Sequence, residues 1–236
     1  MAALTEAGLL AVWEAGSGHG GVRRALVLAA SGGANPSTVA DLSIGRRAEF
    51  VLALRERCFG SVLPSVVTCP GCAEELELEL TVDDVRAAEP QSERRVLVDG
   101  VDVEFRPITS RDLLEVGPHE PDARRRLLSR CVVGATRDGR EIDVGALGDP
   151  VLDALAEALS TCDPQADVLL ELDCAACGHE WSSPFDITAY LWGEMDVYVR
   201  RLVHDVHLLA SAYGWSEAEV LAVSPARRRF YLEMAS

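Results

Sequence analysis

The chain has 236 residues, 48% hydrophobic and 25% charged, which is the composition of a folded protein with one large or two small domains and excludes a disordered chain. Its 38 acidic against 22 basic residues give a formal net charge of −16, which opposes nucleic-acid binding. With no apolar run near the roughly 20 residues that cross a bilayer, and no basic leader, we expect a cytoplasmic protein with no membrane segment and no nucleic-acid partner.

The first 66 residues are predicted to form an N-terminal helical region. Apolar residues recur at helical spacing over residues 4–14, with Thr5 as a possible cap, and again over residues 22–30. A third, stronger helix is predicted over residues 42–60 and ends at a glycine.

Four arginines give this third helix a basic character: Arg46, Arg47, Arg55 and Arg57. Such a pattern usually indicates a solvated helix face, so exposure is the expectation here. The alternative is that these arginines pair with carboxylates inside the protein or at an interface.

Residues 67–106 are predicted to hold a cysteine knuckle, a strand and a β-hairpin. Leucine alternates with glutamate over residues 74–82, as in a half-buried strand with an acidic outer face. Further along, Asp99-Gly100 separates two runs of β-branched residues within residues 94–106, which is a strong signal for a hairpin turn.

Residues 107–165 are predicted to be a helical insertion. One helix begins near Asp112, another spans residues 123–133 before an Asp-Gly turn, and a third, amphipathic helix spans residues 150–160. A second knuckle with two short flanking strands then follows in residues 166–185.

Residues 186–236 are predicted to form one long helix and two short ones. Asp186 can cap the long helix, Ser216 begins a capping box, and Ser224-Pro225 starts the last helix. The long helix carries a continuous apolar stripe, which is typical of a core-facing surface. Its members are Ile187, Leu191, Met195, Tyr198, Leu202, Val206, Leu209 and Tyr213.

Two Cys-x-x-Cys pairs, about a hundred residues apart, are the most informative chemical feature: Cys69 with Cys72, and Cys174 with Cys177. Each lies in a turn of small residues beside alternating apolar stretches, and two such turns supply the four thiolates of a tetrahedral zinc site. The sequence therefore predicts structural Zn²⁺ and an α+β fold. The protein is expected to be mainly helical, with a zinc-ribbon-like β element interrupted by a hairpin and helical insertion.

The four cysteines could also serve in a redox pair or in disulfides. A thioredoxin-type redox pair needs a βαβ setting that neither site has, whereas a disulfide framework stays open. The other three cysteines, Cys58, Cys131 and Cys162, are expected to be small buried hydrophobes. His179 is an alternative ligand only if one cysteine drops out, and otherwise lies on the surface.

The remaining motifs favour a protein without catalytic activity. His204 and His207 lie one helical turn apart but lack a third ligand, so a surface or interface role is expected. The basic run 227–229 in the last helix resembles a DNA-binding element only weakly. No phosphate loop, dinucleotide fingerprint, nucleophile elbow or zinc-protease motif is present, and four thiolates would leave zinc no open position for catalysis.

Four stretches carry a resemblance to a known family: IGRRAEFVLALRERCFG before the first knuckle, FDITAYLWGEM after the second, Tyr213 to Glu217, and Ser224 to Tyr231. They resemble the baseplate hub assembly chaperone family of T-even-type contractile-tailed phages, which has relatives in bacterial contractile injection systems. The resemblance covers most of the chain and is strongest from Arg201 onward. It implies an assembly factor or structural component of a baseplate whose partners are baseplate or hub proteins. Zinc knuckles are not general in that family, so the metal prediction rests on these cysteines alone.

Protein contacts are expected at the C-terminal segment. Tyr213, Trp215 and Arg228 are the candidate anchors, because Trp, Tyr and Arg dominate interface hot spots. Tyr213 and Trp215 have the alternative of packing the turn under the long helix. Two other functions stay open at this point, a zinc-ribbon nucleic-acid or transcription adaptor and a zinc hydrolase with a displaced cysteine.

Overall fold

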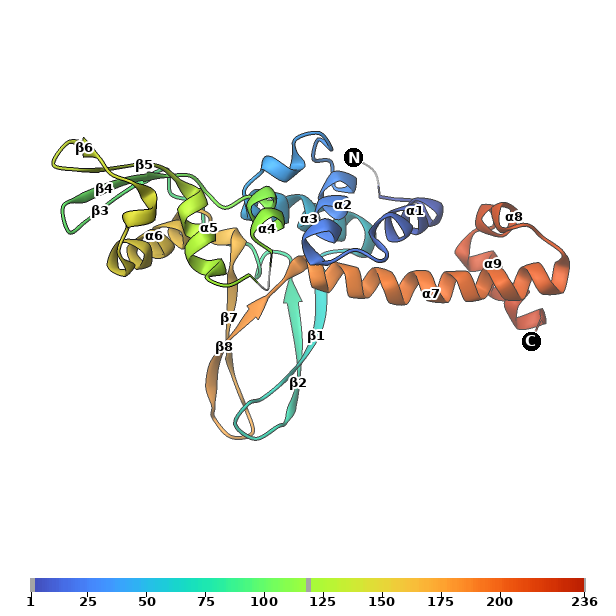
Figure 1. Ribbon diagram of the computed structural model, residues 1–236. Coiled ribbons are helices and arrows are strands. Elements are labelled where there is room, and N and C mark those ends of the chain that lie inside the picture. The colour runs from blue at the N-terminus through green and yellow to red at the C-terminus, as the bar shows by residue number, and fades with distance from the viewer. Residues whose placement is uncertain (1–2, 118–119, 236) are drawn as a thin grey trace.

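The computed structural model describes residues 3–117 and 120–235 and shows an α+β protein that is mainly helical. A helical body occupies the centre, the insertion lies at one end, and a long helix extends from the other (Figure 1). Two β-hairpins project together from the body as an arm (Figure 1). The three β-sheets in the described residues are small and antiparallel.

Three helices form the N-terminal part of the body, as the sequence predicted. The side-chain oxygen of Thr5 accepts a hydrogen bond from the Gly8 backbone N–H at 3.1 Å, which confirms the expected cap. A short 3-10 helix precedes the third α-helix. The elements are α1 (Glu6–Gly16), α2 (Gly21–Ser31), η1 (Val39–Asp41) and α3 (Ile44–Phe59).

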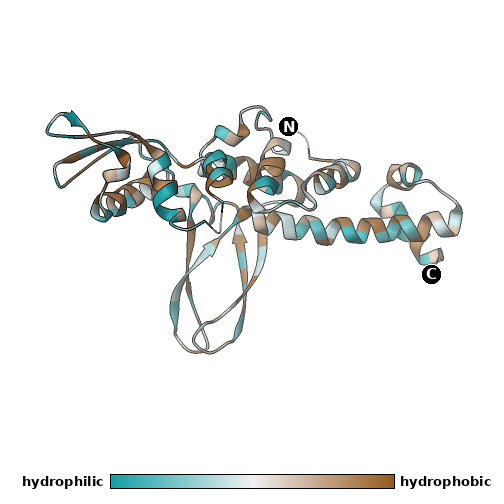
Figure 2. Ribbon diagram, viewed as in Figure 1, coloured by the Kyte–Doolittle hydropathy of each residue, from teal (hydrophilic) through white to brown (hydrophobic). Residues whose placement is uncertain are grey.

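The arm consists of two hairpins, residues 62–81 and 168–185. The strands are β1 (Val62–Thr68) paired with β2 (Glu75–Thr81), and β7 (Val168–Asp173) paired with β8 (Glu180–Phe185). Leucine alternates with glutamate along β2 (Figure 2), and burial alternates along both β2 and β7. β1 begins at Val62, inside the N-terminal helical region that was predicted to extend to residue 66. Val62, Val66 and Val67 are β-branched, and burial alternates along the strand.

The insertion contains a four-stranded sheet in the order β3-β4-β5-β6. The predicted hairpin is confirmed, with β3 (Arg95–Val98) and β4 (Val101–Phe105) joined at Asp99 and Gly100, whose φ angles are 53° and 75°. Its helices are α4 (Ser110–Val116), α5 (Ala123–Cys131) and α6 (Asp149–Cys162), with short 3-10 helices η2 (Val144–Ala146) and η3 (Pro164–Ala166).

The prediction of a helical insertion over residues 107–165 is wrong for residues 132–141, which form two strands. The helix predicted to reach residue 133 ends at Cys131, and β5 (Val132–Arg137) then pairs with β4 on one side and β6 (Arg140–Glu141) on the other. Two consecutive valines start the strand and an Asp-Gly turn ends it, which is strand chemistry.

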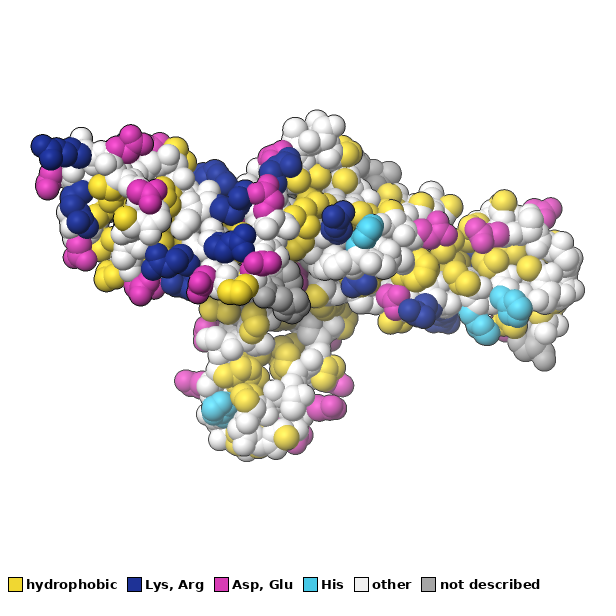
Figure 3. Space-filling view, viewed as in Figure 1, with side chains coloured by type: hydrophobic (Ala, Val, Ile, Leu, Met, Phe, Trp, Pro, Cys, Tyr) yellow, Lys and Arg dark blue, Asp and Glu magenta, His cyan; other side chains and the backbone are white. Residues whose placement is uncertain are grey.

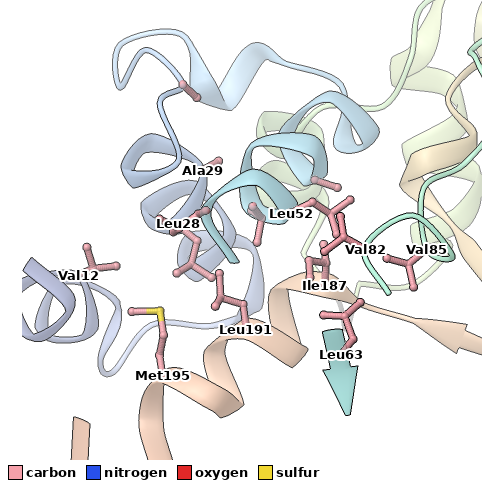
Figure 4. Close-up of a cluster of buried hydrophobic side chains, with 14 of the residues drawn as sticks. Val12, Leu28, Ala29, Leu52, Leu63, Val82, Val85, Ile187, Leu191 and Met195 are labelled. Carbon is pink, nitrogen blue, oxygen red and sulfur yellow. The ribbon is translucent and has the colours of Figure 1, made fainter. Parts of the chain in front are cut away.

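The main core lies where the body meets the arm and the long helix. Ile187, Leu191 and Met195 of α7 (Ile187–Tyr213) point toward Leu28 of α2 and Leu52 of α3 (Figure 4). The same cluster takes in Leu63 of β1 and Val82, which follows β2, so the base of the arm is fixed in the core (Figure 4).

A second core belongs to the insertion. It packs the inner face of the four-stranded sheet, including Val103 and Phe105, against α5 and α6. Leu152 and Leu155 of α6 lie at its centre and are almost fully buried. No residue is shared between the two buried clusters, so the insertion has a hydrophobic interior of its own.

The expectation that the arginines of α3 form a solvated face is wrong for two of them. Arg55 is 1% exposed, and its guanidinium donates two hydrogen bonds to the Glu194 carboxylate at 2.9 and 2.8 Å. Its Nη1 also donates to the Gly60 carbonyl at 2.6 Å, so a charged side chain inside the core has partners on two sides. Arg47 is 7% exposed and donates to Ser110 Oγ.

The C-terminal part follows the prediction closely. Asp186 accepts a hydrogen bond from the Thr188 backbone N–H at 2.8 Å as the cap of α7, and Gly214 ends this helix with a φ of 71°. Two short helices then fold back on it, α8 (Glu217–Ala222) and α9 (Pro225–Ala235). The predicted apolar stripe is buried except at Tyr198 and Val206, which are half-buried, and Tyr213, which is 39% exposed.

Candidate metal centre

The two knuckles have the same backbone hydrogen bonds. In the first, the Cys69 N–H donates to the Glu74 carbonyl at 2.8 Å, and the Ala73 N–H donates to the Cys69 carbonyl at 2.9 Å. In the second, the Cys174 N–H donates to the His179 carbonyl at 2.9 Å, and the Gly178 N–H donates to the Cys174 carbonyl at 2.7 Å. Two segments far apart in sequence therefore present their sulfurs through one kind of turn.

The four sulfurs meet at the tip of the arm. The Sγ atoms of Cys69, Cys72, Cys174 and Cys177 all lie within 4.8 Å of one another. Sγ of Cys69 lies 3.7 Å from Sγ of Cys177, and Sγ of Cys72 lies 3.7 Å from Sγ of Cys174. Four sulfurs at about 2.3 Å from a central zinc are about 3.8 Å apart in a regular tetrahedron, so this donor set fits a tetrahedral ion.

The cysteines are not joined as disulfides, because the sulfur separations far exceed the roughly 2.05 Å of an S–S bond. The disulfide framework considered from the sequence is therefore wrong for these four residues. The closest contacts run between the two knuckles, so a bound ion would join one hairpin to the other.

One cysteine of each pair is buried and the other is exposed. Cys69 and Cys174, the first of each pair, are each 1% exposed, whereas Cys72 and Cys177 are exposed. Burial alone would raise the pKa of the Cys69 thiol, but the backbone N–H groups of Cys72 and Gly71 and the neighbouring thiols lower that pKa to about 7. The backbone N–H of Glu74 would lower the pKa of Cys72, but the neighbouring thiols raise it to about 12. The pKa of Cys177 is raised as well. Loss of one proton from the cluster therefore disfavours loss of the next, as expected for four thiols held close together.

The other histidine and cysteine residues considered from the sequence do not belong to the four-sulfur cluster. His179 is exposed and stacks on Trp181, with ring centroids 6.0 Å apart, as expected for a surface position. The pKa of Cys131 is raised to about 11 by burial, and Cys162 is buried as well. Cys58 is half-buried against the main core.

Sequence reasoning missed the position that lets the two knuckles match. The fifth residue of each turn has a positive φ, 63° for Ala73 and 71° for Gly178. Gly178 was visible as a turn residue, but an alanine at the equivalent position gives no such signal. Gly71 lies close to the other knuckle, since a Cβ there would lie 3.1 Å from the His179 side chain, which would have to shift slightly to accept it.

The C-terminal candidates lie in two different settings. Tyr213 and Trp215 stack with ring centroids 5.0 Å apart, and Tyr231 packs edge-on against both rings. Arg228 is 4% exposed and donates to both oxygens of Glu6 at 2.8 and 2.5 Å. Its guanidinium thus holds α9 against α1 within the chain. His204 and His207 are exposed on α7.

The arm is acidic on the outside. Glu75, Glu77 and Glu79 are exposed along β2, and Glu171 and Asp173 are exposed along β7. Carboxylates are visible at both margins of the arm (Figure 3). Because the arm projects from the body, it presents this charge where a neighbouring molecule could reach it (Figure 1).

Comparison with known families places the chain. The model of the T4 bacteriophage base plate protein family matches residues 31–192, which is more than half of the sequence. The chain belongs to this family. The matched range contains most of the buried residues of the main core, the insertion and all four clustered cysteines. It ends before Arg201, where the resemblance noted from the sequence was strongest.

This membership gives the protein a structural or assembly role in a phage baseplate. No curated protein and no solved structure matches the chain. Among the described residues, no helix is both long enough and apolar enough to cross a membrane.

Proposed function

We propose that this protein is a non-enzymatic assembly factor or structural component of the baseplate of a contractile phage tail or a phage-tail-like injection system. The observation that carries the proposal is the family match over residues 31–192. The likeness of the C-terminal segment to hub assembly chaperones favours action at the hub, with baseplate or hub proteins as partners and no nucleic acid among them.

The clustered cysteines are proposed to hold one structural Zn²⁺. Two buried and two exposed sulfurs at tetrahedral separations are a donor set typical of structural zinc. When bound, zinc would supply four metal–sulfur bonds and no open coordination position. Its role would then be to tie the tips of the two hairpins together, because each hairpin alone has only two strands and little independent stability.

The C-terminal aromatic cluster is proposed as a contact surface for a baseplate partner. Tyr213 is 39% exposed, and Phe230 and Met234 of α9, the helix that carries its neighbour Tyr231, are 66% and 68% exposed. Trp215 stacks on the ring of Tyr213 and Tyr231 packs edge-on against it, so the exposed ring is held in place. Arg228, which the sequence suggested as a third anchor, supports this surface from inside by fixing α9 to α1.

The role in assembly is tested in the producing strain. Deletion of the gene should leave tail tubes and sheaths without complete baseplates in electron micrographs, and the wild-type gene should restore them. A tagged copy, recovered from lysate before and after particle purification, should carry baseplate or hub proteins identified by mass spectrometry. Complete, functional particles in the deletion strain would contradict the proposal.

The zinc site is tested by substitution. Cys72→Ser and Cys174→Ser should each reduce zinc content from one ion per chain to near zero and lower the free energy of unfolding by several kcal/mol, because metal binding is coupled to folding. Elemental analysis and denaturant unfolding measure the two effects. Cys58→Ser is the matched control, since Cys58 lies outside the cluster and should keep its zinc. If wild-type protein purified under reducing conditions contained no zinc, the proposed site would be refuted.

A further inference from the structure

The outer side of the first hairpin sets an apolar row beside an acidic row. On β1, Val62 and Val66 are 50% and 63% exposed, and Pro64 between them is exposed as well. The strand register places Glu79 opposite Pro64 and Glu77 opposite Val66, and opposite residues of a hairpin point to the same side. These five residues form one exposed surface, the hairpin face.

The arm that carries the hairpin face has no arginine or lysine of its own. Residues 62–81 contain four carboxylates and residues 168–185 contain three. Within residues 3–117 and 120–235, neither Glu77 nor Glu79 forms a salt bridge. A partner that covers the hairpin face must therefore bring apolar side chains together with a cation, because a carboxylate buried without a counter-charge is costly.

α9 presents a surface of this kind, the α9 face. Phe230 and Met234 are 66% and 68% exposed, and with Arg227 they recur at the spacing of residues that share one side of a helix. The guanidinium of Arg227 contacts the neutral side chain of Tyr231, whose hydroxyl lies 3.3 Å away. In the described part of the chain, no carboxylate forms an ion pair with Arg227 or with its exposed neighbour Arg229.

The two faces lie too far apart to meet within one molecule. The arm projects from the body near the start of α7, whereas α9 packs near the other end of that helix (Figure 1). α7 has 27 residues and is therefore about 40 Å long. Arg228 fixes α9 in this position through its bonds to Glu6, and Tyr231 packs against Tyr213.

We propose that the α9 face of one copy of this chain docks on the hairpin face of a second copy. Phe230 and Met234 cover the row of Val62 and Val66, and Arg227 lies beside the glutamates of β2. The inference rests on the proposed contact role of the C-terminal surface and identifies the partner of that surface as the same protein.

Charge and symmetry give this contact its character. At physiological ionic strength the Debye length is about 8 Å, so the charges of the two faces outweigh the repulsion between copies of net charge −16. Because each copy uses two different surfaces, the contact is head-to-tail, and repeating it builds a ring or a filament.

The test uses two variants of the full-length protein purified with zinc. Val66→Asp blocks the hairpin face and Phe230→Asp blocks the α9 face, and both side chains are exposed, so folding should be retained. In sedimentation velocity up to about 100 μM, wild-type protein should self-associate and each variant alone should be monomeric. A 1:1 mixture of the two variants should form a dimer and no larger species, because only one pair of intact faces is left.

Charge reversal tests the predicted polar contact. Arg227→Glu should weaken self-association at least about tenfold, since repulsion from Glu77 and Glu79 replaces attraction. Adding Glu77→Arg and Glu79→Arg to the same chain should recover most of this loss. Leu97→Asp is the matched control, because Leu97 is 73% exposed but lies in the insertion, outside both faces.

Monomeric wild-type protein, a mixture of variants that stays monomeric, no recovery on charge reversal, or an equal loss with Leu97→Asp would each overturn the proposal. These results come from purified protein, so they are separate from the test of the assembly role. A monomeric wild-type protein whose gene deletion still removes baseplates would exclude the self-contact and leave the proposed function intact.

Discussion

Ala73 shows how strictly the backbone of a knuckle is specified. It occupies the fifth position of the first turn with a φ of 63°, in the left-handed region where residues with a Cβ are strained. The equivalent residue of the second turn is Gly178, which adopts this conformation without strain. The two turns therefore share one hydrogen-bond pattern at different conformational cost.

We predict that Ala73→Gly stabilises the zinc-loaded protein by about 1 kcal/mol, because relief of the left-handed strain exceeds the added flexibility of the unfolded chain. The reciprocal change, Gly178→Ala, should destabilise the protein by a similar amount. Denaturant unfolding of both variants with saturating zinc measures the difference. Destabilisation by Ala73→Gly would show that the first knuckle does not have this conformation.

Asp112 is the most heavily hydrogen-bonded carboxylate of the insertion. Arg106 donates to both of its oxygens at 2.7 and 2.9 Å, and Arg130 Nε donates at 3.0 Å. The Thr109 backbone N–H and hydroxyl complete a capping box at the start of α4. Burial would raise the pKa of Asp112, but the bonds from Arg106 and Thr109 hold it well below its usual range.

A carboxyl group with a lowered pKa stabilises the fold above its unfolded pKa of about 3.9, and this contribution is lost as the pH falls toward the folded value. We predict that Asp112→Asn lowers the free energy of unfolding by about 2 kcal/mol at neutral pH. The difference from wild type should shrink as the pH falls from about 4 to about 2. Urea unfolding across this range measures it, with Glu115→Gln as a control that alters only a half-exposed partner of Arg130. A difference independent of pH would be inconsistent with an ionised Asp112.

At the scale of elements, helices with a cap and a long apolar stripe could be predicted from the sequence. Thr5, Asp186 and Ser216 all cap the helices assigned to them. The strand β5 could not, because its first residues continue an apolar helical pattern and only pairing with β4 decides their conformation. Local periodicity is ambiguous wherever tertiary pairing selects between two allowed structures.

Some side-chain settings, like some elements, could be predicted from the sequence and others could not. The four ligand positions were visible from spacing, since two Cys-x-x-Cys turns have few other uses. The setting of Arg47 was not visible, because a run of arginines on a helix looks the same whether its partners are water or buried groups. Its burial depends on Ser110, which lies far along the chain in another element.

Loss of metal should affect the tip of each hairpin of the arm more than its base. Near the base, Leu63 is fully buried in the main core, whereas toward the tip Leu76 and Leu172 are only half-buried. We predict that a chelator raises amide hydrogen exchange near the tips of both hairpins by at least about tenfold, because isolated two-stranded hairpins are marginal.

The helices of the main core and the sheet of the insertion serve as internal controls, since their cores do not depend on the arm tip. Their exchange should stay within about twofold of the metal-loaded protein. Loss of protection throughout the chain would show instead that the ion holds the whole fold together, as it does in the smallest zinc domains.

At the scale of the whole molecule, a buried ion pair joins the two ends of the chain. Arg228 of α9 donates to both oxygens of Glu6 on α1, and Tyr198 of α7 donates to the same carboxylate at 2.8 Å. Arg228 has a second, more distant carboxylate in Asp205 at 3.8 Å. Three helices from opposite ends of the sequence therefore converge on Glu6.

Breaking this pair from one side should cost more than removing both partners, because a single deletion leaves an uncompensated buried charge. We predict that Arg228→Met lowers the free energy of unfolding by about 3 kcal/mol, and that adding Glu6→Gln recovers at least about 1 kcal/mol of that loss. Arg229→Met is the matched control. Arg229 is the next residue along α9 and its side chain is exposed, so this substitution should change the free energy of unfolding little.

Burial would raise the pKa of Glu6, but the hydrogen bonds from Arg228 and Tyr198 lower it. The pair is therefore fully stabilising above the unfolded pKa of about 4.3 and weakens as the pH falls through the lowered value. Double-mutant cycles at pH 7 and at pH 3 should give a smaller coupling energy at the lower pH. Strictly additive effects at pH 7 would mean that α9 is not held to α1 through these two side chains, and that the aromatic surface of the C-terminal segment is positioned by α7 alone.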